Sequence, residues 1–305
     1  MNGRQLPIIL ALGTTQTLAW ASSYYLPAIL ADPIAHDLGV SSNWIFAAFS
    51  ASLVISAVLG PRVGRQIDLV GGRHVLSISN LTLAAGLALL GFTYSIPVLI
   101  MAWLLLGIGM GFGLYDAAFG ALGRIYGNAA RGAITGITLI AGFASTVGWP
   151  LTAFGLESIG WRDTCFAWAA AHILVGLPIN FFMLPAVTAS KAATKTPVKP
   201  HIPIDRTMVL LAFAFAAAWS VTGAMAAHFP RILEAAGATS VQAVAAGALI
   251  GPAQVAARIV EASLLSRYHP LVSTRLAGIS FDPRRADWSL SRDLAVNYLV
   301  MAVRR

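Results

Sequence analysis

Long uncharged runs dominate the sequence and leave few choices of fold. Each run holds about 20 or more mostly apolar residues, enough for a helix to cross about 30 Å of hydrocarbon. Because lipid offers no hydrogen-bonding partners, the backbone of each run must satisfy its own polar groups. We therefore expect an all-α integral membrane protein. Its spans are expected at roughly 6–30, 43–63, 75–95, 97–123, 130–156, 162–185, 207–229 and 240–264.

The composition excludes several other classes of protein. Only 10% of the residues are charged, whereas soluble domains have about 25%. The net charge of +8 does not indicate a nucleic-acid partner, because the basic residues are spread among short connections. A single cysteine, Cys165, excludes an intrachain disulfide and a cysteine-based metal cage. No HExxH, GxSxG or paired carboxylate lies in a span, so we expect neither an enzyme nor a bound cofactor or metal.

The basic residues alternate between successive connections. Arg4 precedes the first span, and the connections at 61–74, 124–131 and 186–206 are rich in Arg or Lys, while those between them have one basic residue or none. Basic connections favour the cytoplasmic side. The alternation predicts a multi-pass protein of the cell (inner) membrane whose N-terminus is cytoplasmic.

The order of the spans suggests two unequal bundles. Residues 1–187 are expected to form a six-helix bundle, and 188–206, rich in Lys and Pro, a cytoplasmic linker. Residues 207–275 would supply two helices of a second bundle, and 276–305 form an atypical charged tail.

A weak internal repeat supports this division. Gly60-Pro61 is followed by Arg65 and Asp68, and Gly251-Pro252 is followed by Arg258 and Glu261. Parallel six-helix halves are a known transporter plan. Arg258 and Glu261 are expected to pair with each other or to form a second-half counterpart of Arg65 and Asp68.

Two equal halves would run past residue 305, so we expect a chain truncated after about eight of twelve spans. The tail would then be a foreign, frame-shifted segment. The alternative is a short amphipathic tail lying on the membrane. Its apolar face would consist of Leu290, Leu294, Tyr298 and Met301.

The segment GPRVGRQIDLVGGRH, residues 60–74, interrupts the apolar sequence. Gly60 and Gly64 would let helix ends approach closely, and Gly71-Gly72 would allow a sharp turn with positive φ. Asp68 is expected near the start of the third helix, where the helix dipole favours a carboxylate. Arg73 would pair with an acid or with a lipid phosphate. The alternative is a solvated positive-inside loop.

This segment resembles the signature G-x-x-x-D-x-x-G-x-[RK] of major facilitator superfamily transporters, with Gly64, Asp68, Gly71 and Arg73 at its positions. Leu69 stands where the family usually has a basic residue. A second hallmark, GWR, is present at Gly160-Trp161-Arg162. The resemblance covers about 6–275 and implies an MFS-type six-helix N-terminal bundle plus the first two helices of a second bundle.

The resemblance also implies a function. The chain would move a small-molecule substrate across the lipid bilayer by alternating access. Asp68 and Arg73 would form a cytoplasmic charge latch, which in the family rests partly on an eleventh helix that this chain does not reach. Gly148, Pro150 and Gly155 partly resemble an exporter motif, which slightly favours export. The alternative is a remnant that inserts without transporting, or a membrane binding or assembly partner.

Three residues within the spans are candidates for the solute or proton site. Asp116 lies within the fourth span, where a carboxylate is costly and signals function. It would bind a proton or a cationic substrate; the alternative is an ion pair with Arg124 or Arg131. Gln16 and Trp20 share one helix face and are expected to line the cavity.

Two further features are expected to serve packing. Glycines at 107, 109, 111 and 113 should allow close helix contacts. His172, in the sixth span, is expected to be a hydrogen-bonded packing residue rather than a ligand.

Overall fold

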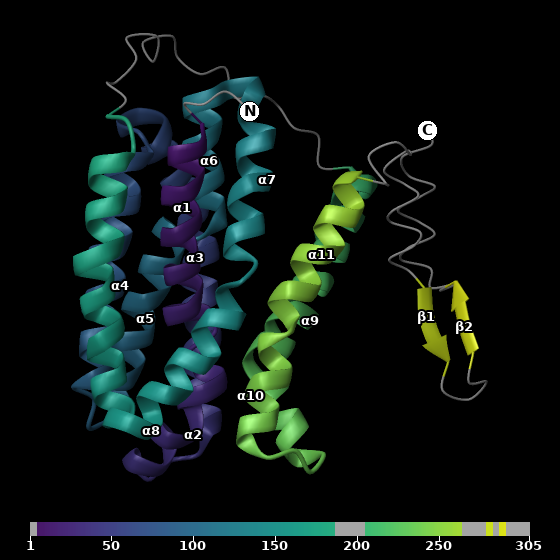
Figure 1. Cartoon of the computed structure of the whole chain (residues 1–305). Helices are drawn as coiled ribbons and strands as arrows, with labels where there is room; N and C mark the ends of the chain where they lie inside the picture. Colours follow the sequence, from purple (N-terminus) through teal and green to yellow (C-terminus); the bar gives the residue numbers. More distant parts are fainter. Residues whose placement is uncertain (1–4, 187–204, 264–278, 283–286, 291–305) are drawn as a thin grey trace. The chain divides into compact units, whose positions relative to one another are not determined.

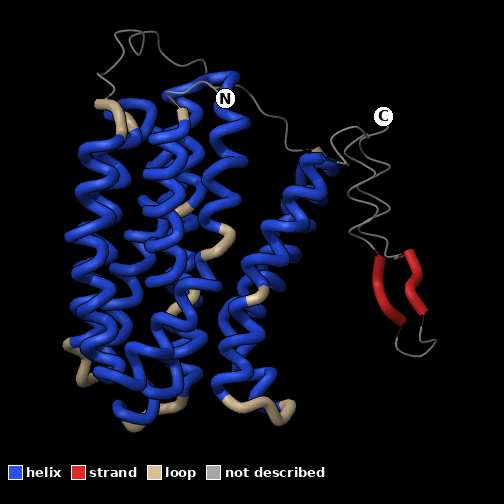
Figure 2. The backbone as a smooth tube through the Cα atoms, in the orientation of Figure 1, coloured by secondary structure: helices blue, strands red, loops and turns tan. Residues whose placement is uncertain are grey.

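The computed structural model describes residues 5–186, 205–263, 279–282 and 287–290 (Figures 1 and 2). Helices make up nearly all of this part, which confirms the expected all-α membrane fold. The exception is one antiparallel pair, β1 (Ile279–Asp282) and β2 (Asp287–Leu290), in the segment expected to be an atypical tail.

The described residues divide into two compact units. One lies within Met1–Thr196 and Ala226–Pro252, and the other within Pro197–Met225 and Ala253–Arg305. The first unit contains α1 to α8, which lie side by side as a bundle (Figure 1).

The first span is longer and more broken than its hydropathy predicts. It runs as α1 (Leu6–Ala19), the π-helical segment η1 (Trp20–Tyr24) and α2 (Pro27–Leu38). Gly39 ends α2 in the left-handed conformation, with φ 64°. The connection expected at 31–42 is therefore mostly helical.

The second span also continues past its expected end. Helix α3 (Ser42–Val70) is capped at its N-terminus by Ser41, whose hydroxyl accepts a hydrogen bond from the backbone N–H of Asn43 (3.3 Å). It passes through Pro61 and includes most of the segment expected to be a loop. The prediction was wrong because the onset of charge marks where a helix leaves the hydrocarbon, not where its backbone hydrogen bonds stop. The next helix, α4, is Gly72–Gly91.

By length and composition, five stretches of the described residues could cross a membrane, and one of them, Ile96–Met183, has 88 residues. It contains α5 (Ile96–Gly113), α6 (Tyr115–Tyr126), η2 (Gly127–Ala129), α7 (Ala130–Ala141), α8 (Ala144–Ala171), η3 (His172–Gly176) and η4 (Ile179–Met183). As one straight helix, this stretch would be about 130 Å long. The chain must therefore reverse its direction within it. Gly127 (φ 53°) and Gly160 (φ 81°) supply the positive-φ backbone at the two reversals.

The glycines of α5 let this helix sit between two neighbours. A Cβ added at Gly107 would lie 2.5 Å from the Ser52 carbonyl oxygen on α3. One added at Gly113 would lie 1.8 Å from Ser79 Oγ on α4. The expected packing role of these glycines is confirmed, because any larger residue would push the helices apart.

The remaining helices are α9 (Arg206–Ala235), α10 (Ser240–Ala248) and α11 (Ile250–Ser263). Thr239 and Gln242 form a capping box at the start of α10. Within the first unit α10 packs on α8, and the Thr146 hydroxyl donates to the Ala248 carbonyl (2.6 Å).

Candidate functional site

The three candidate residues, Gln16, Trp20 and Asp116, lie at a break between α5 and α6. Leu114 adopts an extended conformation (φ −80°, ψ −170°), so a new helix, α6, starts at Tyr115. The Gln16 side-chain amide donates to the Gly113 carbonyl at 2.5 Å. Gln16 thereby ties α1 to the last turn of α5 at the break.

Aromatic rings cover the same place. The ring centroid of Trp20 lies 4.8 Å from that of Tyr115, and Tyr115 stacks on Phe119 at 5.2 Å with the planes 10° apart. Trp20 lies on η1, and π-helical segments are frequent at functional sites. The site is thus a helix break faced by an aromatic cluster.

The residues of this site differ in how much of their surface is exposed. Gln16 is 1% exposed and Trp20 8%, while Tyr115 and Phe119 are half-buried and Asp116 is exposed. The expected exposure of Gln16 and Trp20 to a cavity is therefore not seen in this structure. Gln16 Oε1 and Trp20 Nε1 are both buried without a hydrogen-bond partner in the described part.

Asp116 occupies the first turn of α6, where the positive end of the helix dipole favours a carboxylate. The alternative ion pair with Arg124 or Arg131 is not formed among the described residues. Arg124 instead donates to the backbone carbonyl of Asp68. Asp116 is left as an exposed carboxylate beside the helix break.

The 60–74 segment differs from its sequence interpretation in two respects. Gly71 has φ 85°, as expected for the turn, and a Cβ on Gly72 would lie 2.2 Å from the Cβ of Ala121. At Gly60 and Gly64, however, an added Cβ would meet no atom within 4 Å. The expected close approach at these two glycines is wrong for the described structure, because their helix face is open.

Asp68 is the second difference. It lies in the last turn of α3, not near the start of the third helix, so the helix dipole disfavours its carboxylate. Arg124 offsets this by capping the Asp68 carbonyl with a guanidinium. No ion pair joins Asp68 to Arg65 or Arg73 within the described ranges. The Arg73 guanidinium instead lies 4.1 Å from the centre of the Phe181 ring.

Arg162 is a structural residue that the sequence interpretation placed only within a hallmark motif. It forms an ion pair with Asp37 of α2 and donates to the Thr93 carbonyl at 2.8 Å. Its guanidinium also lies over the rings of Trp161 (4.1 Å) and Tyr94 (4.4 Å). One side chain therefore joins three connections of the bundle.

A second ion pair lies on α2. Arg231 Nε is 3.1 Å from Asp32 Oδ2, and nearby the ring centroids of Phe46 and His228 are 4.2 Å apart. These contacts attach the end of α9 to α2 and α3 within the first unit.

A buried polar network that the sequence did not predict runs through the bundle. His172 contacts Ser22 Oγ (2.7 Å) and Asn80 Oδ1 (3.0 Å). Asn180 accepts from Thr15 at 3.1 Å and donates weakly to the Leu76 carbonyl at 3.4 Å, which also accepts from Asn80 at 2.8 Å. The expected packing role of His172 is confirmed. Asn80 and Asn180 lie inside apolar spans, and their positions could have indicated such a network from the sequence.

Several other expectations concern residues outside the described part of the chain. Arg258 and Glu261 both lie on α11, but the Glu261 side chain is outside the described residues, so their pairing stays a prediction. Also outside them are residues 188–204 of the proposed 188–206 linker, residues 264–275 of the proposed second bundle, and residues 276–278, 283–286 and 291–305 of the tail.

Comparison with known families identifies one broad match. A family profile described as Major Facilitator Superfamily matches residues 12–281.

Two curated relatives share part of the sequence. One is the mouse "Solute carrier family 2, facilitated glucose transporter member 10", 33% identical over 155 residues, which is 47% of this chain and 27% of the relative. The other is the "Oxalate:formate antiporter" of Oxalobacter formigenes, 32% identical over 114 residues, 37% of this chain and 27% of the relative. The matches thus span about a quarter of each relative's length.

Solved structures that this chain matches include tetrameric PepTSo2. It is 16% identical with a TM-score of 0.49, covering 98% of this chain and 58% of that one. A structure titled for substrate recognition in proton dependent oligopeptide transporters is 17% identical with a TM-score of 0.48. It covers 88% of this chain and 57% of that chain.

Proposed function

Because the chain belongs to the major facilitator superfamily, we propose that it is a secondary active transporter that moves a small solute by alternating access. The observation that carries the proposal is the α5–α6 break, where Asp116 directly follows Tyr115 of the Trp20–Tyr115–Phe119 cluster. Broken helices whose ends face the substrate are a recurrent transporter device.

The chemistry of this site favours a neutral polar or a cationic solute. Aromatic faces bind cations and the apolar faces of polyhydroxylated molecules, and Asp116 would repel an anion. The arginines of 5–186 flank the apolar spans, whereas the carboxylate of Asp116 lies within one of them. These arginines are Arg62, Arg65, Arg73, Arg124, Arg131 and Arg162. Of the two relatives, the one named for glucose transport is the better guide to the substrate class.

We assign proton coupling to Asp116, because an exposed carboxylate at a helix break can be protonated as the solute leaves. We propose export as the direction of transport, because Gly148, Pro150 and Gly155 partly resemble an exporter motif. The arginine distribution supports an inner-membrane protein with a cytoplasmic N-terminus.

The domain plan belongs to the same proposal. A six-helix bundle would occupy 1–187, a cytoplasmic linker 188–206 and a partial second bundle 207–275, followed by the tail 276–305. Gly64, Arg65, Asp68, Gly71 and Arg73 would act as the cytoplasmic gating motif. The open face at Gly60, Gly64 and Asp68 supports this role, because it leaves room for another helix to dock.

The test is uptake or efflux of radiolabelled glucose, choline and oxalate in vesicles that contain the 305-residue chain. Asp116→Asn should abolish transport of the preferred solute, whereas Asp163→Asn, an exposed carboxylate away from the site, should not. Full transport by Asp116→Asn contradicts the coupling role, and preference for oxalate contradicts the solute class.

A second candidate is a chain that inserts and binds a partner without transporting. This candidate is favoured because the matches cover only 27% of the length of each curated relative. The same assay on a version extended to about twelve spans separates the two. Transport by the 305-residue chain itself contradicts the second candidate, and transport by the extended version alone supports it.

A further inference from the structure

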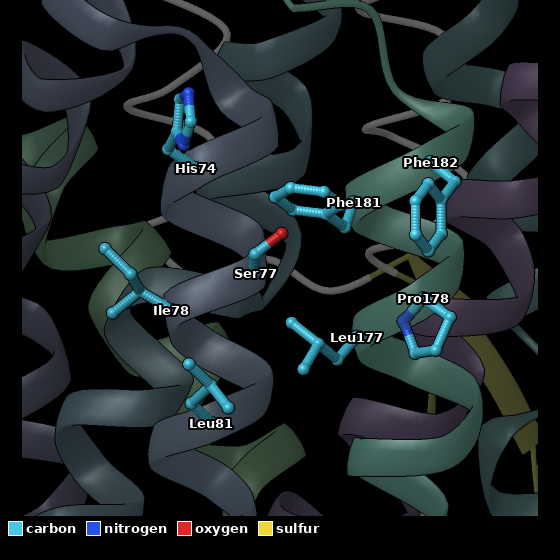
Figure 3. Close-up of a pocket in the computed structure, with 8 residues that line it drawn as sticks. All are labelled: His74, Ser77, Ile78, Leu81, Leu177, Pro178, Phe181 and Phe182. Carbon is cyan, nitrogen blue, oxygen red and sulfur yellow. The ribbon is translucent and has the colours of Figure 1, made fainter.

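A groove of about 430 Å³ runs between α4 and the last helical part of the sixth span (Figure 3). Residues at i, i+3, i+4 and i+7 form its α4 wall and so share one helix face. Figure 3 shows the other wall across from them, on the segment that contains η4. The lining consists of His74, Ser77, Ile78 and Leu81 on one side and Leu177, Pro178, Phe181 and Phe182 on the other.

The groove opens toward the outside of the bundle. Ile78 and Leu81 are each 48% exposed and Phe182 is 76% exposed. Because α4 is a membrane-spanning helix, these apolar surfaces meet lipid chains rather than water. A long apolar slot at this depth therefore fits an acyl chain.

One end of the groove is polar and positively charged. Arg73 and His74 lie in the first turn of α4, and Leu81 lies about 10 Å deeper along the helix axis. The Arg73 guanidinium is held 4.1 Å over the ring of Phe181, which lines the groove. Its Nε is buried without a hydrogen-bond partner in the described part of the chain. This end can therefore receive an anion.

Ser77 supplies a polar group partway along the apolar slot. It is 7% exposed, and its Oγ has no hydrogen-bond partner among the residues described. A buried hydroxyl without a partner is costly. An ester carbonyl of a lipid at this depth would satisfy it.

From these observations we propose that the groove binds one phospholipid with an anionic headgroup. The phosphate lies against Arg73 and His74, the Ser77 hydroxyl donates to an ester carbonyl, and an acyl chain fills the slot along Ile78 and Leu81. The groove lining contains no carboxylate to balance the positive group of a zwitterionic headgroup. Basic pockets between membrane helices favour anionic lipids for this reason.

The proposal is tested by lipid binding, so it does not depend on transport. The full chain, purified in mild detergent, is titrated with phosphatidylglycerol or with phosphatidylcholine of the same acyl chains, and bound lipid is counted by native mass spectrometry. Phosphatidylglycerol should bind more tightly. Arg73→Gln should weaken that binding about fivefold, since one basic residue near an anionic lipid contributes about 1 kcal/mol. Arg73→Lys should retain most of it.

Arg131→Gln is the matched control, because Arg131 is an exposed arginine on another helix, and it should leave binding unchanged. Leu81→Trp should reduce binding by filling the slot while keeping Arg73, and Ile78→Trp repeats this test if the first variant does not fold. Added inorganic phosphate should not displace the lipid. Equal retention of both lipids, or phosphatidylglycerol binding unchanged by the slot-filling variants, would overturn the proposal.

Discussion

The imidazole Nε2 of His172 lies 2.7 Å from the hydroxyl of Ser22, at the point where two π-helical segments, η3 and η1, face each other. The other ring nitrogen contacts Asn80 on α4. Because both side chains and their partner are buried, this contact joins the first, third and sixth spans where lipid and water are excluded.

Replacing His172 by Leu should lower the free energy of unfolding by about 1–3 kcal/mol, because it leaves the side-chain amide oxygen (Oδ1) of Asn80 buried without this partner. Thermal unfolding in detergent measures the change. Thr82→Val is the control, since the exposed Thr82 hydroxyl bonds only to its own helix. Equal melting temperatures for the two variants would show that the network adds no stability.

Arg162→Lys should destabilise the bundle by about 1 kcal/mol even though the charge is kept. Lysine cannot hold Asp37 and the Thr93 carbonyl together while stacking on Trp161. The loss should be modest because the Arg162 and Asp37 side chains are 24% and 42% exposed, so water weakens their attraction. Arg131→Lys should have no measurable effect in the same unfolding assay, and a loss as large as that of Arg162→Lys would rule out this explanation.

Two glycine substitutions should act in opposite directions. Gly107→Ala should cost about 1–3 kcal/mol, because its Cβ would lie 2.5 Å from the Ser52 backbone oxygen. Gly123→Ala, in α6, meets no atom within 4 Å and should stabilise by up to about 1 kcal/mol through helix propensity. The ranking of the two melting temperatures is the readout, and a reversed order would contradict the close α3–α5 packing.

The Asp32–Arg231 ion pair should contribute little to stability, since its side chains are 53% and 37% exposed. A double-mutant cycle with Asp32→Asn and Arg231→Gln should give a coupling free energy below about 1 kcal/mol. A larger value would mean that the pair is held in a more buried arrangement than the structure shows.

Much of the architecture could be read from local sequence. Hydropathy predicted the all-α membrane fold, because apolar runs of membrane length have few other stable states. The pattern at Gly71 predicted the positive-φ turn, since only local sterics decide which residue can adopt it. The glycines of α5 likewise predicted close packing before any neighbour was known.

Other features could not be predicted from the sequence, because they depend on contacts between residues that are distant in sequence. Asp68 was expected at the start of a helix and lies at the end of one, since hydropathy does not report where hydrogen bonding stops. Gln16 was expected to line a cavity and is instead tied to the Gly113 carbonyl.

The sequence by itself determined a helical membrane protein with a charged, glycine-rich segment at 60–74 and a carboxylate inside the fourth span. Only the tertiary structure decided that Asp116 sits at a broken helix beside Tyr115, that His172 contacts Ser22, and that Arg73 lies over a ring that lines an apolar groove. The physical reason is that polarity and backbone sterics act within a few residues. Hydrogen bonds, ring contacts and grooves arise between helices, and their positions depend on how the side chains of those helices pack.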